Sequence, residues 1–417
     1  MQAANLVFKT TACDPLPNAR GRGTLTRSRS DTHRRTALIR CQRPTDESPQ
    51  AVAIKPCEKR SFSKGSDLQL SRRNLVTGTG LALSLTASSA TLGGGPAFAE
   101  EAILWDGVGR RPNAIVTGAN TGIGKSISEE LARRGWSVTL ACRNPSKAEA
   151  AAADIRAITG SDAIECKTLD LASFQSIHDF AEGWGDASSR PIDALINNAG
   201  VMAVFPQQFT KDGFELTFGV NHLGHFLLTC LLESSLRAGS VDGSAGGRVV
   251  VTSSAAHQLA QNGMNFNDLN YTTNSYKRWG AYGQSKLANI LMMRELDRRC
   301  HQIDGCGVTA YSFHPGVVDT ELIRYLVSEK TMDDKLINPE RSKFLARRVF
   351  GLKSPEEGAA TGVYLATSKE VEALHSEYFD SKKLGLCSSA GRNMEAAARL
   401  WEMSLELTGA PKGAWSA

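Results

Sequence analysis

A glycine-rich loop between an apolar run and a helical pattern is the feature that most constrains the fold of this chain. The apolar run covers 114–117, the loop reads Gly118-Ala119-Asn120-Thr121-Gly122-Ile123-Gly124, and helical periodicity follows over 125–134. Glycines allow tight turning and close backbone approach, and a helix N-terminus offers free N–H groups to a pyrophosphate. The spacing differs from the common G-x-G-x-x-G, but its position between strand and helix predicts a dinucleotide site.

The rest of the body alternates apolar runs with helical patterns. Further strands are expected at 138–142, 164–169, 194–196, 248–252 and 308–313, and further helices at 146–158, 214–236 and around 282–289. This alternation predicts an α/β fold, a single domain built on a doubly wound (Rossmann) parallel sheet of about seven strands. In such sheets ligands bind at the carboxyl ends of the strands.

Residues at those strand ends are therefore candidate cofactor contacts. Arg143 lies 19 residues past Gly124, where an NAD site would have an acid. A guanidinium there suits a 2′-phosphate, so NADP(H) is favoured over NAD(H), although an exposed arginine at a strand end is the alternative reading. Two further strand ends supply candidates for the adenine side and for the turn that lines the cleft: Asp170 and Leu171, then Asn198, Ala199 and Gly200.

Tyr282 and Lys286 are four residues apart on a predicted helix, so their side chains share one face. An ammonium beside a phenol favours the phenolate, and we expect it to lower the pKa of Tyr282 from about 10. A solvated helix face is the alternative for this pair taken alone. Ser254 follows the strand at 248–252, where a hydroxyl could meet a substrate carbonyl, and Asn221 lies in an apolar helical pattern where its amide requires a partner.

Taken together, these motifs resemble the short-chain dehydrogenase/reductase family over about 113–409, and the retinol dehydrogenase-like branch in particular. The stretches Asn265-Phe266-Asn267-Asp268-Leu269-Asn270, Ser285-Lys286-Leu287-Ala288-Asn289 and Arg399-Leu400-Trp401-Glu402 carry the resemblance to that branch. It implies that Tyr282 donates a proton to a substrate carbonyl, while Lys286 lowers the tyrosine pKa and binds the nicotinamide ribose. Ser254 would orient the carbonyl and Asn221 would hold a water of the proton relay. Four later positions are implied cofactor contacts: Pro315, Gly316, Val318 and Thr320.

The resemblance implies an oxidoreductase that interconverts a carbonyl and an alcohol on an apolar, retinoid- or isoprenoid-like molecule. Two alternatives stay open, an NADP-sensing regulatory or import-associated module with little turnover and a protochlorophyllide reductase-like enzyme, although the extra loop of the latter is missing from the sequence. A Ser-His-Asp hydrolase using Ser254 and His257 is disfavoured because no G-x-S-x-G elbow is present. His222, His225 and His257 are expected to be satisfied core or pocket-lining residues. Segments 264–277 and 322–350 are expected to cover the substrate.

The first 99 residues are expected to be a targeting leader ahead of one domain at 100–417. Residues 1–43 are rich in Arg, Ser and Thr, Arg72-Arg73 precedes a mildly apolar run at 75–91, and Ala97-Phe98-Ala99 is an A-x-A cleavage pattern. These signals predict chloroplast import and transport into the thylakoid lumen, with the stroma or the thylakoid surface as alternatives.

The charge distribution and the cysteine positions limit which binding partners and metal sites are expected. The leader has 15 Lys and Arg against 6 Asp and Glu while the whole chain is only +5, so the body is slightly acidic and nucleic-acid binding is not expected. The six body cysteines form no C-x-x-C pair or zinc-like cluster, which predicts that most are small core residues and that no metal site is present, while disulfides among them stay open. A small-molecule substrate is the expected partner, and peripheral membrane association and a homo-oligomer remain open.

Overall fold

The computed structural model describes residues 105, 107, 109–241, 243–319 and 352–416. The predicted leader, Thr320 and the segment 322–350 lie outside these residues. No helix in the described ranges is long and apolar enough to cross a membrane.

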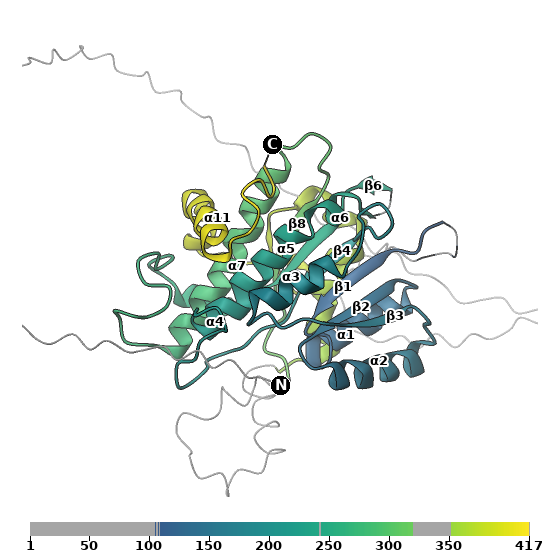
Figure 1. Ribbon diagram of the computed structural model, residues 1–417, viewed down its shortest axis with the longest axis horizontal. Coiled ribbons are helices and arrows are strands. Elements are labelled where there is room, and N and C mark those ends of the chain that lie inside the picture. The colour runs from purple at the N-terminus through teal and green to yellow at the C-terminus, as the bar shows by residue number, and fades with distance from the viewer. Residues whose placement is uncertain (1–104, 106, 108, 242, 320–351, 417) are drawn as a thin grey trace, which may run out of the picture. The chain divides into compact units, whose positions relative to one another are not determined.

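An eight-stranded sheet forms the centre of the described body (Figure 1), in the order β10-β9-β8-β7-β4-β1-β2-β3. The strands are β1 Asn113–Thr117, β2 Ser137–Cys142, β3 Ile164–Thr168, β4 Ala194–Asn197, β7 Arg248–Thr252, β8 Thr309–His314, β9 Tyr378–Asp380 and β10 Lys383–Leu384. Every pair is parallel except the edge pair β9–β10. The doubly wound prediction is confirmed, and the count of about seven strands is exceeded by the short antiparallel β10.

Helices pack on both faces of the sheet, and they are α1 Gly122–Arg133, α2 Pro145–Thr159, α3 Phe174–Glu182, α4 Leu216–Phe218, α5 Gly224–Leu231, α6 Glu233–Arg237, α7 Arg278–Cys300, α10 Pro355–Thr367 and α11 Met394–Thr408. Short helical turns are η1 Gly219–Leu223, η2 Ala255–Leu259, η4 Lys369–Leu374 and η5 Ala390–Arg392. Side-chain hydrogen bonds to the backbone fix where several of these helices begin. Asn144 caps α2 by accepting from the Lys147 N–H, and Ser354 with Glu357 forms a capping box on α10.

Alternation along the central strands divides the interior into two apolar layers. Ile115 packs in one layer with side chains of α3, α5, α7 and α11, while its neighbours Ala114 and Val116 pack in the other with α1, α2 and α10. Both layers are buried, which explains why the central strands read as continuous apolar runs rather than alternating ones.

The predicted single helix at 214–236 is wrong in detail. The segment is divided into α4, the π-helical turn η1, α5 and α6. Asn221 lies within the π-helical turn, a local widening that often occurs at functional sites. A separate two-stranded ribbon, β5 Ser240–Val241 with β6 Ser244–Ala245, was not expected from the sequence.

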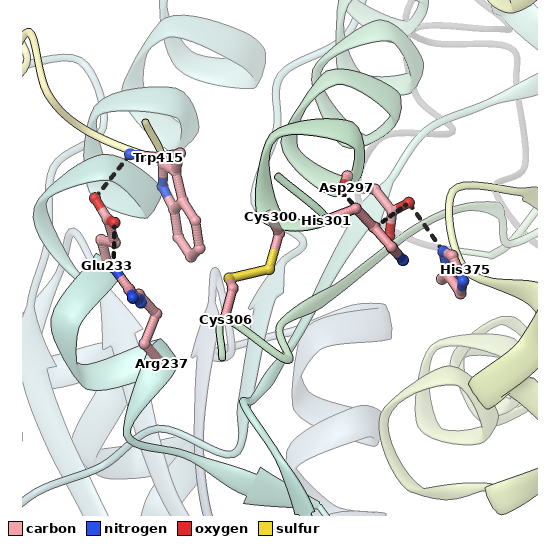
Figure 2. Close-up of a disulfide and its surroundings, with 8 residues drawn as sticks. All are labelled: Glu233, Arg237, Asp297, Cys300, His301, Cys306, His375 and Trp415. Carbon is pink, nitrogen blue, oxygen red and sulfur yellow. Dashed lines mark hydrogen bonds and ion pairs between the residues drawn. A yellow bond between two sulfur atoms is a disulfide. The ribbon is translucent and has the colours of Figure 1, made fainter. Parts of the chain in front are cut away.

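A disulfide joins Cys300, the last residue of α7, to Cys306 (Figure 2). Cys300 and Cys306 are buried in the core, as are the free Cys142 and Cys230, which agrees with the expectation that most body cysteines are small core residues. Whether any of them formed a disulfide was left open by the sequence. Spacing alone did not reveal it, because the bond depends on how the chain turns after α7.

Candidate functional site

A cleft of about 830 Å³ lies at the carboxyl ends of the central strands. It brings together nearly all of the predicted cofactor residues, namely Gly118, Asn120, Thr121, Gly122, Ile123, Gly124, Arg143, Asp170, Leu171, Asn198, Ala199, Gly200, Pro315, Gly316 and Val318. Ser254, Tyr282 and Lys286 line the same cleft. Thr320 lies outside the described residues, and Asn221 is buried behind the cleft rather than in its wall.

The glycine loop is held against the turn that follows β4. Gly118 has φ +65°, and a Cβ there would lie 3.0 Å from Ala199 Cα. A Cβ on Gly124 would lie 2.5 Å from Asn198 Nδ2 and 2.6 Å from the Gly118 carbonyl oxygen. A larger residue at either position would push the two turns apart and change the floor of the cleft.

The N-terminus of α1 opens into this cleft. Its N-cap residue Thr121 makes no side-chain hydrogen bond to the first turn, and Gly122, Ile123 and Gly124 all line the cleft wall. In the described part of the chain, the first-turn N–H groups are therefore left for a ligand, and the helix dipole favours an anionic one.

Two cations stand where a 2′-phosphate would be expected. Arg143, at the end of β2, and Lys147, in the first turn of α2, are both exposed and both line the cleft. Neither forms an ion pair with another residue in the described ranges. Lys147 was not predicted from the sequence, although its position four residues after Arg143, at the start of the next predicted helix, could have identified it.

Asp170 is committed to its own turn rather than being fully available. One carboxylate oxygen accepts from the Ala172 N–H at 3.1 Å, and the other pairs with Lys211 at 3.3 Å. The residue still lines the cleft beside Leu171. These contacts fix the wall of the cleft after β3. An adenine ring could bind Asp170 only through the lone pairs of the carboxylate that these two contacts leave free.

Tyr282 projects from the second turn of α7 into the cleft, where it packs on Trp279 with ring centroids 6.1 Å apart. Burial raises the pKa of Tyr282 to about 12, and hydrogen bonding with Ser254 opposes that rise. The expectation of a lowered tyrosine pKa is therefore wrong for the protein alone, because desolvation of the phenolate outweighs the stabilising contacts. At neutral pH Tyr282 holds its proton.

Lys286 is buried one turn further along α7. Its ammonium lies 5.6 Å from the centre of the Tyr282 ring and donates to the Thr252 carbonyl at 2.9 Å. Burial lowers the pKa of Lys286 to about 8. The Ser253 hydroxyl donates to the Lys286 carbonyl at 2.8 Å, so the end of β7 positions this turn of the helix.

Asn221 organises the turn after β4. Its side-chain oxygen accepts from the Val201 N–H at 2.8 Å, and its amide donates to the Val201 carbonyl at 2.9 Å and to the Ser285 hydroxyl at 3.0 Å. All three bonds are to protein groups, so the side chain supports the cleft from behind. A water held by this side chain, as the resemblance implied, would have to compete with these partners.

A buried chain of hydrogen bonds, missed in the sequence, links β1 to the same turn. The Thr117 hydroxyl oxygen accepts from the N–H groups of Asn198 and Ala199, each at 2.9 Å, and lies 2.9 Å from His225 Nε2. His225 Nδ1 lies 3.1 Å from the Asn221 carbonyl, which can only accept. Nδ1 is therefore the protonated nitrogen, and Thr117 donates to Nε2. Burial lowers the pKa of His225 to about 4, which keeps the ring neutral.

His257 is a satisfied residue, as expected, and this geometry argues against a hydrolase. Its Nδ1 donates to the backbone carbonyl of Ser254 at 2.7 Å, and its Nε2 accepts from the Ser388 N–H at 3.1 Å. Both ring nitrogens are occupied, so neither can take a proton from the Ser254 hydroxyl. That hydroxyl instead accepts from the Ala256 N–H at 3.1 Å.

The long connection before α7 is anchored to the start of α4. Asn270 accepts from the Glu215 N–H at 2.9 Å, and the Tyr276 hydroxyl donates to the Glu215 carboxylate at 3.2 Å. Asp268 organises the insert itself by accepting from Thr272, Thr273 and Asn274. The segment 264–277, which was expected to cover the substrate, is thus ordered and tied to the start of α4, but none of its residues lines the cleft.

The arrangement suits proton transfer beside a bound dinucleotide. A protonated phenol, a hydroxyl and an ammonium line the same cleft as a helix N-terminus and two cations. The donors are preorganised by backbone contacts from β7 and α7, which lowers the cost of orienting them during a reaction.

Comparisons with known proteins agree with this geometry. Residues 112–266 match the model of the short chain dehydrogenase family. The chain is 45% identical over 298 residues to retinol dehydrogenase 13 from Homo sapiens, covering 71% of this chain and 84% of that protein. It is 44% identical over 299 residues to retinol dehydrogenase 12 from Mus musculus, covering 71% and 85%. A solved structure of an uncharacterized protein from Mycobacterium paratuberculosis is 34% identical with a TM-score of 0.54, covering 72% of this chain and 94% of that one.

Proposed function

The chain belongs to the short chain dehydrogenase family and is an NAD(P)-dependent oxidoreductase, and we propose that it uses NADPH to reduce a carbonyl on an apolar, retinoid- or isoprenoid-like substrate. One observation carries the proposal. Ser254, Tyr282 and Lys286 line the same cleft as the glycine loop, so a proton donor and a candidate dinucleotide site share one cavity.

The residues present fit a bound dinucleotide. The open first turn of α1 and the close approach of Gly118 and Gly124 to the β4 turn form a cradle for a pyrophosphate. When bound, the nicotinamide supplies hydride chemistry, and the protein supplies orientation and proton transfer.

Tyr282 donates the proton in this mechanism. Its hydroxyl gives a proton to the substrate oxygen as negative charge develops there, while the Ser254 hydroxyl fixes the carbonyl by hydrogen bonding. The raised pKa of Tyr282 keeps the phenol protonated at neutral pH, so it can donate this proton. Lys286, held by Thr252, stabilises the phenolate that forms and would also hold the cofactor ribose.

NADP(H) is the proposed cofactor because Arg143 and Lys147 put two cations at the strand end where a 2′-phosphate would lie. An apolar substrate is supported by the wall beside Tyr282, where Met202, Val204, Leu216 and Trp279 line the cleft. The names of the relatives, retinol dehydrogenases 13 and 12, support the same class.

Turnover of a carbonyl series tests the function. NADPH oxidation should be fastest with long apolar aldehydes such as retinal and slow with small polar ketones, because longer chains bury more apolar surface in the cleft. Equal rates across chain lengths would leave a generic carbonyl reductase. NADPH binding without reduction of any carbonyl in the series would instead support an NADP-sensing or import-associated module. Selective reduction of protochlorophyllide would support a protochlorophyllide reductase-like enzyme.

For location, we propose a chloroplast protein whose leader ends at Ala99, with the mature domain in the thylakoid lumen. The twin-arginine and A-x-A signals support this, as does the Cys300–Cys306 disulfide, because disulfides persist in oxidising compartments. N-terminal sequencing of the protein from protease-treated thylakoids should find Glu100 in the protected fraction. A start within residues 42–60 in protease-sensitive material would place it in the stroma or on the thylakoid surface.

A further inference from the structure

Three potential metal ligands meet where α7 ends. Asp297 is in the last turn of α7, His301 is the residue that caps the helix, and His375 follows η4 (Figure 2). None of the three lines the dinucleotide cleft.

Their donor atoms are close enough to share one ion. A carboxylate oxygen of Asp297 lies 2.9 Å from His375 Nδ1 and 3.5 Å from His301 Nδ1, and one donor atom from each residue lies within 4.8 Å of the others. The two imidazole rings stack with centroids 4.5 Å apart. In Figure 2 dashed lines join Asp297 to both His301 and His375.

Asp297 has an unused ligand atom. The side chain is 6% exposed, and its Oδ1 is buried without a hydrogen-bond partner among the residues that the structure describes. Such an atom normally costs stability, so its burial calls for a partner that the described residues do not supply. The side chains of His301 and His375 are 54% and 31% exposed, which leaves an ion a route from solvent.

The surrounding backbone holds the ligands in place. Asp297 and His301 are four residues apart, so they share one face at the end of α7. His301 follows Cys300 directly, and the disulfide to Cys306 fixes the chain immediately beyond the helix. His375 is brought in from a different segment, so a shared ion would join α7 to the chain that leads into β9.

We propose that Asp297, His301 and His375 form a binding site for a divalent transition-metal ion, of which Zn²⁺ is the best fit. Two imidazoles and a carboxylate are ligands that zinc accepts at tetrahedral geometry, with water in the fourth position. The ion has a structural role, because it ties the end of α7 to the segment before β9 and satisfies the buried carboxylate.

Zinc binding to untagged, chelator-treated protein tests the proposal by calorimetry. The wild type should bind one Zn²⁺, and His301→Ala and His375→Ala should each weaken binding by at least about tenfold. His178→Ala on α3, outside the cluster, should bind as the wild type does. Saturating zinc should also raise the melting temperature of the wild type and of His178→Ala, but not that of the His301→Ala/His375→Ala double variant.

Crystals of the wild type soaked in zinc give a test that needs no variant to fold. An anomalous peak between the three side chains supports the site, and a peak elsewhere or none overturns it. Unchanged zinc affinity in the double variant would overturn it equally.

Discussion

The ammonium of Lys286 donates a 2.9 Å hydrogen bond to the backbone carbonyl of Thr252, which fixes the lysine of α7 to the carboxyl end of β7. The same burial that permits this bond lowers the pKa of Lys286 to about 8. The group is therefore charged in neutral solution and becomes neutral under mildly alkaline conditions, within a range that kinetics can examine.

The first prediction is that kcat/KM for carbonyl reduction falls as pH rises through about 8, following loss of one proton from Lys286. Below that pH the ammonium is present, and above it the stabilisation of the Tyr282 phenolate is lost. The measurement is a pH–rate profile with NADPH held constant. In Lys286→Arg, whose guanidinium stays charged, any remaining activity should show no fall near pH 8. A wild-type profile that is flat from pH 7 to about 9 would contradict the assignment.

The second prediction is that Tyr282→Phe lowers kcat by roughly 10²- to 10⁴-fold while the affinity for NADPH stays close to wild type. Only the hydroxyl is removed, and the ring still packs on Trp279. Single-turnover kinetics and fluorescence titration separate the two effects. Lys286→Ala serves as the comparison, because it should weaken both turnover and cofactor binding. Wild-type rates in the Phe variant would rule out Tyr282 as the proton donor.

The third prediction concerns the two cations at the cleft. Arg143→Asp should shift preference from NADPH toward NADH, because the new carboxylate repels the 2′-phosphate and accepts from a ribose hydroxyl. Lys147→Ala should weaken NADPH binding and leave NADH binding unchanged. Arg133→Ala is the control, since Arg133 pairs with Glu129 and Glu130 and does not line the cleft. If both cofactors bind all variants alike, the 2′-phosphate lies elsewhere.

The fourth prediction is that Thr117→Val lowers the free energy of unfolding by about 2 kcal/mol and weakens NADPH binding, because two part-buried N–H groups lose their hydrogen bond to the hydroxyl and the buried His225 Nε2 loses its donor. Those N–H groups belong to Asn198 and Ala199 in the cleft wall. Thr117→Ser keeps the hydroxyl and should behave nearly as the wild type. Urea unfolding and cofactor titration provide the measurements. Equal stability and NADPH affinity in the Val and Ser variants would show that the hydrogen bonds of the Thr117 hydroxyl contribute to neither.

The fifth prediction is that replacing Cys300 and Cys306 by Ser lowers the free energy of unfolding by about 2 kcal/mol, as expected for closing a short loop. The bond spans six positions in the sequence and lies at the end of α7. The wild type treated with a reductant should unfold like the double variant. Identical denaturation curves for oxidised and reduced wild type would show that the bond adds no stability.

The local sequence was sufficient to predict the central strands, the glycine loop and the helical pairing of Tyr282 with Lys286. The central strands fall within a residue or two of their predicted bounds, because buried parallel strands need continuous apolar runs that the sequence displays directly. The glycine loop was equally readable, since close approach at Gly118 and Gly124 leaves few other residue choices. The Tyr282–Lys286 spacing followed from helical geometry alone.

Tertiary structure decided what those residues experience. The direction of the Tyr282 pKa depends on burial against Met202, Ala203 and Trp279, which no spacing rule measures. The partners of Asn221 come from Val201 and Ser285, at distances of 20 and 64 positions along the chain.

The disulfide and the cluster of Asp297, His301 and His375 likewise could not be predicted from local sequence. His375 lies 78 positions from Asp297, so no local motif marks the cluster, and Cys306 meets Cys300 only because the chain turns back after α7. Local patterns determine which elements form, because hydrogen bonding and side-chain periodicity act over a few residues. Pairing and burial between distant segments determine the electrostatics of the site, because these depend on contacts that exist only once the sheet and its helices have packed.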